Sequence, residues 1–271
     1  MASKYISKNS NYQKVDKLIM VASPLLGTPK TYDIFANGES LTGGSFAPHA
    51  LSVLAGLGIS LTDLAAKTKQ LAPNLQSGYE LLPSPKYYSL NNINTIYYYD
   101  PKLGTNIVNT YYNGHQATKD FLLSSQYQSI TNTTNNTMMN NAITFQNSLF
   151  LSNGEHVTTL CNTYYLVGIG KVTTSFIERR GSHILPRANN LPNGDGTVVF
   201  WSADIGNKYP SKTFYINDSS APWDAHTTMV QNTGQLNFIV DILNGSTSNY
   251  SNRGFTKTRP AITKLNDTQV I

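Results

Sequence analysis

Two short segments hold the residues whose types suit acid–base chemistry. Residues 193–198 read Asn-Gly-Asp-Gly-Thr-Val, so that Asp195 stands between two glycines. A tight turn of this kind presents a carboxylate without crowding it. Residues 223–229 read Trp-Asp-Ala-His-Thr-Thr-Met, with His226 just after an expected strand and just before an expected helix. A histidine base with a carboxylate that fixes its tautomer is the acid–base pair of serine hydrolases. The simpler alternatives are a turn-forming Asp and a capping or core His.

The nucleophile of such a pair is not evident. No Gly-x-Ser-x-Gly occurs in the 271 residues. The nearest imitation, residues 43–47 (Gly-Gly-Ser-Phe-Ala), follows no expected strand, whereas a nucleophile elbow joins a strand to a helix. Ser3 and Ser23 also lack an elbow context, and we interpret both as structural. Asp195 and His226 are therefore the candidate catalytic residues, without a partner serine of their own.

Four segments together resemble the lecithin:cholesterol acyltransferase-like group of α/β-hydrolases. They are residues 15–29 (Val-Asp-Lys-Leu-Ile-Met-Val-Ala-Ser-Pro-Leu-Leu-Gly-Thr-Pro), residues 77–84 (Ser-Gly-Tyr-Glu-Leu-Leu-Pro-Ser), the block 194–198 and His226. The order of the segments matches that group over about residues 1–243. Position 25 is Leu where the group usually has His, so no role of that His is carried over. The chain order Asp then His is also that of α/β-hydrolases.

The resemblance implies roles for individual residues. Asp195 would be the triad acid and His226 the base, and residues 30–155 would form a cap that contacts the acyl chains. It implies substrate-binding positions at Leu25, Leu26, Tyr79, Leu81 and Leu82. The group's nucleophile elbow lies just before the helix that begins this chain, so an upstream half with the nucleophile is an expected partner. In its complete form the protein would hydrolyse or transfer acyl groups of lipid-like esters, without a cofactor or metal.

Two other functional classes remain open. The chain is alternatively a catalytically inactive lipid-binding or interaction module that has kept the cap and lost the nucleophile. A structural or adhesive role fits the abundance of Asn, Thr and Tyr but explains neither Asp195 nor His226. The DNA upstream of Met1 distinguishes a truncated enzyme from an inactive module. If it encodes, in frame, a strand followed by a Gly-x-Ser-x-Gly elbow, the chain is part of an enzyme.

Hydrophobic patterning predicts an α/β fold: the C-terminal part of an α/β-hydrolase sheet, with its last parallel strands and helices, and a large, mostly helical cap insertion. Continuous apolar runs indicate strands buried on both faces at 18–22, 159–170 and 212–216, with a shorter strand at 97–99. Helices are expected at 50–69 and 228–243. The predicted regions are 1–29 (core), 30–155 (cap), 156–245 (core with the acid and His loops) and 246–271, a polar tail.

Composition excludes several classes of partner. The net charge of +5 and pI near 9.1 come from scattered basic residues, which argues against nucleic-acid binding. The single cysteine and the widely spaced histidines give little support to a metal site. The N-terminus has no apolar signal region and no stretch is apolar enough to be a transmembrane segment. The localisation is unknown, although the low charged fraction of 13% hints at a secreted or cell-surface parent.

Overall fold

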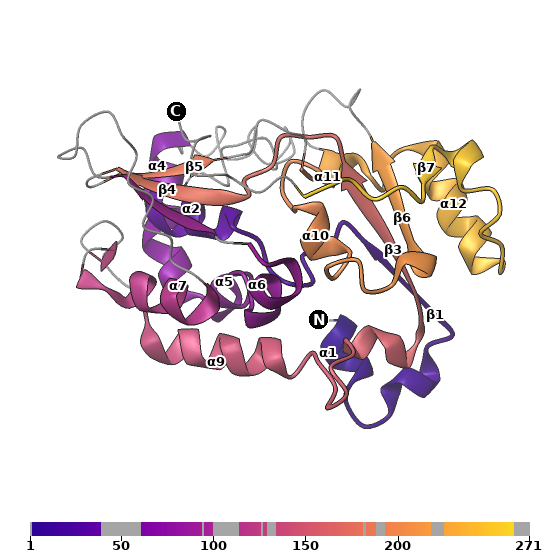
Figure 1. Ribbon diagram of the computed structural model, residues 1–271, viewed down its shortest axis with the longest axis horizontal. Helices are drawn as coiled ribbons and strands as arrows, with labels where there is room; N and C mark the ends of the chain where they lie inside the picture. Colours follow the sequence, from indigo (N-terminus) through magenta and orange to yellow (C-terminus); the bar gives the residue numbers. More distant parts are fainter. Residues whose placement is uncertain are drawn as a thin grey trace.

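The computed structural model describes residues 2–38, 61–93, 95–99, 114–125, 127–128, 134–180, 183–187, 193–217 and 225–262. The helices are α1 (Ala2–Ile6), α2 (Lys30–Asn37), α4 (Leu61–Leu71), α5 (Gln76–Glu80), α6 (Pro85–Asn91), α7 (Gly114–Leu123), α9 (Asn136–Asn147), α10 (Phe200–Ala203), α11 (Ala225–Thr228) and α12 (Thr233–Leu243). The strands are β1 (Lys17–Val21), β2 (Ile96–Tyr99), β3 (Asn162–Ile169), β4 (Phe176–Arg180), β5 (His183–Arg187), β6 (Thr213–Asn217) and β7 (Phe255–Thr256). In Figure 1, the sheet that contains β3, β6 and β7 lies with α12 on one side of the molecule, and most other helices lie on the opposite side.

The larger sheet has the order β1-β3-β6-β7. Strands β1, β3 and β6 are parallel, and β7 pairs antiparallel with β6. The three parallel strands fall at the three apolar runs that predicted them. The mixture of helices with a mostly parallel sheet confirms the predicted α/β class.

Both faces of the central strands are buried, as continuous apolar runs require. Tyr164, Leu166 and Phe214 pack on the face covered by α12, in a cluster with Phe238 and Ile242. The alternate side chains pack on the opposite face against α6 and α10, and this second cluster includes Tyr165, Val167, Tyr215, Tyr87 and Trp201. In contrast, all five residues of β1 are only partly buried, because β1 has no further strand beyond it among the described residues.

A second sheet joins segments that are far apart in the sequence. Its order is β2-β4-β5, with β2 parallel to β4 and β4 antiparallel to β5. Sequence patterning predicted a short strand at β2, which is confirmed. The β4–β5 hairpin lies within the region 156–245 that was assigned to the core, yet it pairs with β2 from the cap region. Residues 176–180 and 183–187 therefore form a sheet with a strand of the region 30–155 and not with the larger sheet.

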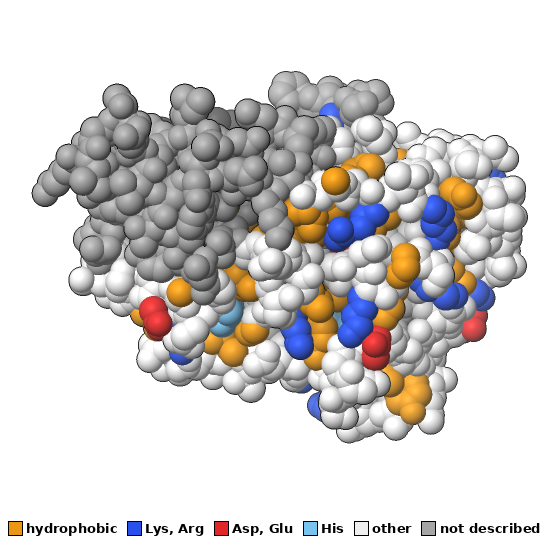
Figure 2. All heavy atoms as spheres, in the orientation of Figure 1, with side chains coloured by type: hydrophobic (Ala, Val, Ile, Leu, Met, Phe, Trp, Pro, Cys, Tyr) orange, Lys and Arg blue, Asp and Glu red, His pale blue; other side chains and the backbone are white. Residues whose placement is uncertain are grey.

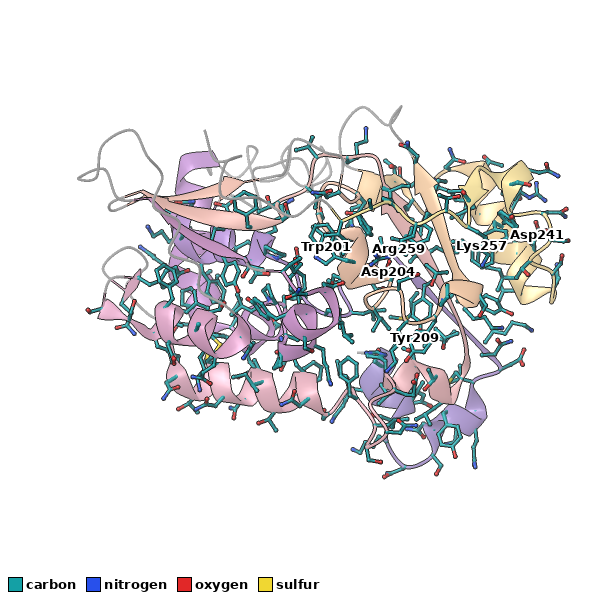
Figure 3. All side chains as sticks on the ribbon, viewed as in Figure 1. Trp201, Asp204, Tyr209, Asp241, Lys257 and Arg259 are labelled. Carbon is teal, nitrogen blue, oxygen red and sulfur yellow. The ribbon has the colours of Figure 1, made fainter. Side chains whose placement is uncertain are left out.

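The predicted polar tail packs against the larger sheet over part of its described residues, 246–262. Strand β7 pairs with β6, and Phe255 is 3% exposed. The Lys257 ammonium donates hydrogen bonds to the carbonyl oxygens of Ser211 (2.8 Å) and Thr213 (2.9 Å). Burial lowers the pKa of Lys257 to about 8. These contacts hold a mostly polar segment that has too few apolar residues to be recognised as structured. Figure 3 labels Lys257 and Arg259 on this segment.

The helix expected at 228–243 is interrupted. Helix α11 ends at Thr228, and α12 begins only at Thr233. Asn232 caps α12, because its side-chain oxygen accepts the backbone N–H of Gly234 at 2.8 Å. A new N-terminus is favoured where an Asn side chain satisfies an otherwise unpaired backbone donor. For the helix expected at 50–69, residues 61–69 lie in α4 and the rest falls outside the described residues.

The turn after β1 is joined to the segment between α5 and α6 by backbone hydrogen bonds. Thr28 N–H donates to the Leu81 carbonyl and Ser84 N–H donates to the Leu26 carbonyl, both at 2.8 Å. Between these two bonds Gly27 adopts φ +89° and lies against the backbone of Leu82. A Cβ atom at position 27 would be only 2.2 Å from the Leu82 carbonyl oxygen. The junction therefore needs glycine for both its conformation and its lack of a side chain.

We expect Gly27→Ala to lower the free energy of unfolding by about 3 kcal/mol or more, since it combines left-handed strain with a backbone clash. Gly154→Ala is the matched control. Gly154 has a similar φ of +78° but nothing lies within 4 Å of its missing Cβ, so only the conformational cost of about 1 kcal/mol applies. Urea denaturation of both variants measures the difference. Equal losses of unfolding free energy would show that the close approach of Leu82 does not require glycine at position 27.

Residue His156 is fully buried and N-terminal to a 3-10 turn at Val157–Leu160. Its Nδ1 accepts the Thr158 N–H, and the Thr158 hydroxyl lies 2.8 Å from the same nitrogen and 2.6 Å from the Tyr165 hydroxyl. The Nε2 atom has no hydrogen-bond partner among the described residues. Burial lowers the pKa of His156 to about 4, with a smaller contribution from Lys208.

Stability should therefore decrease on acidification. Because the folded-state pKa of His156 lies below its unfolded value, the unfolded chain binds the extra proton first, and stability is lost as the pH falls from about 6.5 towards about 4. We expect His156 alone to remove about 2 kcal/mol between pH 7 and pH 5. His156→Asn keeps a side-chain acceptor for Thr158 but does not titrate. The measurement is a pH series of urea melts. If this variant lost as much stability between pH 7 and pH 5 as the wild type, protonation of His156 would not be the cause of the loss.

Candidate active site

The two candidate catalytic residues lie at the same edge of the larger sheet. Asp195 follows β3 after the β4–β5 hairpin, and His226 is in α11, which follows β6. Since β3 and β6 are adjacent and parallel, their carboxyl ends bring the two loops together. Residues 223 and 224 of the His segment lie outside the described residues.

The side chains of these two residues contact each other. His226 Nδ1 lies 2.9 Å from Asp195 Oδ2, which is within hydrogen-bond reach, as an acid–base pair requires. A second bond joins the same residues, because His226 N–H donates to the Asp195 carbonyl oxygen at 3.0 Å. The Asp195 side chain is 1% exposed and the His226 side chain is 29% exposed. The predicted contact is confirmed, and the carboxylate is enclosed while the imidazole reaches the surface.

The other carboxylate oxygen is held by the turn itself. Asp195 Oδ1 accepts the backbone N–H groups of Thr197 at 2.9 Å and Val198 at 2.7 Å. Gly196 adopts φ +95°, which closes the turn, and its N–H donates to the Thr173 hydroxyl at 2.9 Å. Both oxygens of the carboxylate are thus fixed before any substrate binds. With a carboxylate facing Nδ1, the imidazole carries its proton on Nδ1 and its lone pair on Nε2.

Two residues that support Asp195 were not predicted. The hydroxyl of Thr173 accepts the Gly196 N–H and donates to the Lys171 carbonyl oxygen at 3.0 Å, so it fixes the loop. Gly168 in β3 lies directly under the loop, because a Cβ there would be 2.6 Å from Asp195 Cβ. An isolated glycine inside a strand often marks a close backbone approach, and this signal was present in the sequence. Nothing in the sequence pointed to Thr173.

We expect Gly168→Ala to separate Asp195 from His226 without preventing folding. The new methyl group must displace either the Asp195 loop or Met229, whose sulfur would lie 2.9 Å from it. The measurement is the low-field imidazole N–H signal of His226 in a proton NMR spectrum, which reports a hydrogen bond to the carboxylate. The signal should be lost in Gly168→Ala and in Asp195→Asn. A retained signal in Gly168→Ala would show that the loop tolerates the methyl group.

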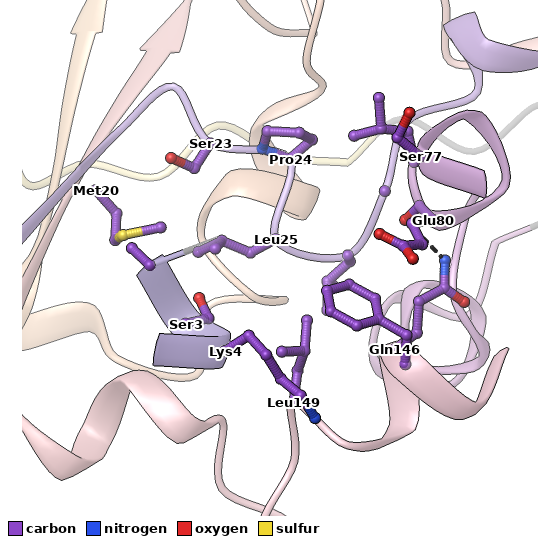
Figure 4. A pocket seen from close by; sticks show the side chains of 15 residues that line it. Ser3, Lys4, Met20, Ser23, Pro24, Leu25, Ser77, Glu80, Gln146 and Leu149 are labelled. Carbon is purple, nitrogen blue, oxygen red and sulfur yellow. Dashed lines mark hydrogen bonds between the residues drawn. The ribbon is translucent and has the colours of Figure 1, made fainter. Parts of the chain in front are cut away.

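A cavity of about 390 Å³ opens at the carboxyl end of β1. Three of the predicted substrate-binding residues line it, namely Leu25, Leu26 and Leu81. Figure 4 shows Leu25 projecting into its centre, between α1 and the helix that carries Ser77 and Glu80. The turn that forms this wall continues to the Asp195 loop, because the Thr28 hydroxyl donates to the Thr197 carbonyl oxygen at 3.0 Å. The cavity and the Asp195–His226 pair therefore belong to the same edge of the sheet.

The other two predicted substrate-binding residues do not line this cavity. Tyr79 and Leu82 are 0% and 4% exposed and pack in a hydrophobic cluster with Phe35, Phe121 and Met139. The Tyr79 hydroxyl also donates to the Pro73 carbonyl oxygen at 2.8 Å. The physical reason is the geometry of α5, which turns Tyr79 inward and leaves Glu80 and Leu81 on the cavity. A substrate-binding role for Tyr79 and Leu82 stays a prediction from the resemblance.

The described residues contain no group of three or more His, Cys, Asp or Glu side chains arranged to hold a metal ion. None of their helices is long and apolar enough to cross a membrane. On the face shown in Figure 2, the basic side chains of the described part are separated by uncharged atoms and do not form a continuous stripe.

Neither the models of known protein families nor the curated proteins give a match to this sequence.

Proposed function

We propose that this chain supplies the acid and the base of a serine-type α/β-hydrolase that acts on lipid-like acyl esters. The single observation that carries the proposal is the 2.9 Å contact between His226 Nδ1 and the buried Asp195 carboxylate. A buried, doubly anchored carboxylate facing a partly exposed imidazole is the arrangement that orients a general base. In this proposal β1, β3 and β6 are the last parallel strands of a hydrolase sheet, and the mostly helical region 30–155 is its cap.

The topology supports this reading. An acid on the loop after one parallel strand and a histidine after the next, in that chain order, is the α/β-hydrolase arrangement. The outer side of β1 is unpaired within the described residues, and such an edge accepts a further strand. The strand and elbow that carry the nucleophile would add there. The cavity beside β1 would then adjoin the reacting serine.

The proposed chemistry is acyl transfer through a covalent intermediate. As the serine Oγ attacks the ester carbonyl carbon, His226 Nε2 takes the proton from the serine hydroxyl. The leaving alcohol departs with that proton when the tetrahedral intermediate collapses to the acyl-enzyme. Water or another alcohol then attacks the acyl-enzyme, again with His226 as base. Asp195 keeps the imidazole in the required tautomer and stabilises the imidazolium that forms.

The first experiment compares the 271-residue chain alone with the same chain joined to the coding sequence upstream of Met1. The chain alone should not hydrolyse a p-nitrophenyl ester, because triad residues act as a unit and a pair without its nucleophile has little activity. The extended protein should hydrolyse it, provided that the upstream DNA encodes a Gly-x-Ser-x-Gly elbow in frame. Turnover by the short chain that disappears in His226→Ala would reveal a serine within these residues and refute this division of roles.

The second candidate is a lipid-binding module without catalysis. The observation that favours it is the cavity, together with the lack of a Gly-x-Ser-x-Gly sequence in the chain. A stop codon upstream of Met1, with no neighbouring half-gene for the nucleophile, supports the module and excludes the enzyme.

A further inference from the structure

The cavity beside β1 contains a carboxylate in a largely apolar wall. Glu80, the last residue of α5, lines the cavity, and Figure 4 shows its carboxylate directed toward the cavity centre. Most of the surrounding side chains are apolar, and they include Met20, Pro24, Leu25, Phe145 and Leu149. A carboxylate in such surroundings attracts a cation more strongly than one on an open surface, because water screens it less.

Within the described part of the chain, the Glu80 carboxylate has no counter-ion. The hydrogen bond between Glu80 and Gln146 involves the Glu80 backbone carbonyl oxygen, which accepts Gln146 Nε2 at 3.1 Å, and not the carboxylate. The one cationic residue of the lining is Lys4. Its ammonium donates to the Ser148 hydroxyl at 2.8 Å, and Figure 4 shows it turned away from Glu80. Among the described residues, the Glu80 carboxylate is therefore not paired with the one cation of the lining.

We propose that this cavity binds a small amphiphile with a cationic head group, which pairs with Glu80 while its hydrocarbon part lies against the apolar wall. The volume of about 390 Å³ is within the range of small-molecule sites. Both features of the ligand follow from the wall: apolar side chains favour a hydrocarbon, and an unpaired carboxylate favours an ammonium group over a neutral or anionic one. The proposal goes beyond the acyl-ester chemistry and does not depend on Asp195 or His226.

The test is a binding titration with three probes of equal chain length: octylammonium, octanol and octyl sulfate. Methionine methyl groups labelled with carbon-13 report the location, because Met20 lines the cavity whereas Met229 lies beside Asp195. Octylammonium should shift the Met20 signal and bind about tenfold more tightly than octanol, with octyl sulfate weakest. Raising the ionic strength should weaken octylammonium binding and leave octanol binding unchanged.

Glu80→Gln should abolish the preference for the ammonium probe while octanol binding remains. The matched control is Asp120→Asn, which removes an exposed carboxylate on α7 that accepts a hydrogen bond from Gln116, and it should retain the preference. The signals of buried Met139 and Met229 verify that each variant is folded. Equal affinities for the three probes, an unshifted Met20 signal, or a preference that survives in Glu80→Gln would each overturn the proposal. Catalytic inactivity of the extended protein would leave these binding results unaffected.

Discussion

Replacing Asp195 by Asn in the protein that also contains the nucleophile should lower kcat about 10 000-fold, as expected when the histidine of a triad loses its orienting carboxylate. An Asn at this position keeps the volume and one oxygen, but it presents an N–H group to His226 Nδ1. The imidazole then carries its proton on the wrong nitrogen. KM should change little, because the carboxylate is buried beneath the site and 1% exposed, away from bound substrate.

His226→Ala should lower kcat to a similar extent, and the double variant should be no worse than either single one, because the residues act together. His115→Ala is the control for the loss of a histidine. His115 lies in α7 against Tyr88, with a pKa lowered to about 4 mainly by burial. Its replacement should affect stability but leave kcat near the wild-type value. Additive losses in the Asp195/His226 double variant would contradict a shared role.

Replacing Arg259 by Ala should cost about 3 kcal/mol or more of unfolding free energy, since it leaves a buried carboxylate without its cation. Arg259 Nε lies 2.6 Å from Asp204 Oδ2, and the Asp204 side chain is 0% exposed. The same carboxylate accepts the Tyr215 hydroxyl at 2.9 Å. Figure 3 shows Asp204 and Arg259 adjacent to each other, next to α10.

Arg253 provides a matched control on the same C-terminal segment. It forms an ion pair with Asp241 at 3.0 Å, but both side chains are more exposed, at 32% and 19%. Arg253→Ala should therefore cost about 1 kcal/mol or less. Urea denaturation of both variants, with a double-mutant cycle between Arg259→Ala and Asp204→Asn, measures the contrast. Equal losses at the two arginines, or a negligible coupling energy between Asp204 and Arg259, would show that the segment is held by other contacts.

The parts of the fold that the sequence predicts are those specified by local patterns. The runs at β1, β3 and β6 are apolar on successive residues, and such runs identify strands buried on both faces. The Asp195 turn is likewise encoded locally by its two glycines. The contact between Asp195 and His226, 31 residues apart, was predicted only through the order and resemblance of the motifs.

The parts that were missed depend on distant partners. The β4–β5 hairpin forms its sheet with β2, which lies far earlier in the chain, since Ile177 of β4 pairs with Ile96 of β2. The segment 255–259 has only one large apolar residue, the buried Phe255. Its order also depends on the ion pair with Asp204 and on the Ser211 carbonyl oxygen, which are distant in the sequence. Helix α5 buries Tyr79 and leaves Glu80 on the cavity. The sequence does not reveal which side of this five-residue helix is buried, because so short an element has no measurable periodicity.

The central claim, that Asp195 and His226 activate a serine carried by polypeptide upstream of this chain, is tested most directly by labelling with a fluorophosphonate. The protein is extended by the upstream coding sequence, allowed to react, and digested so that mass spectrometry identifies the modified serine. The account predicts a single labelled serine in an upstream Gly-x-Ser-x-Gly sequence, with labelling reduced at least about 1000-fold in His226→Ala. A labelled serine among residues 1–271, or labelling that His226→Ala leaves unchanged, would contradict it.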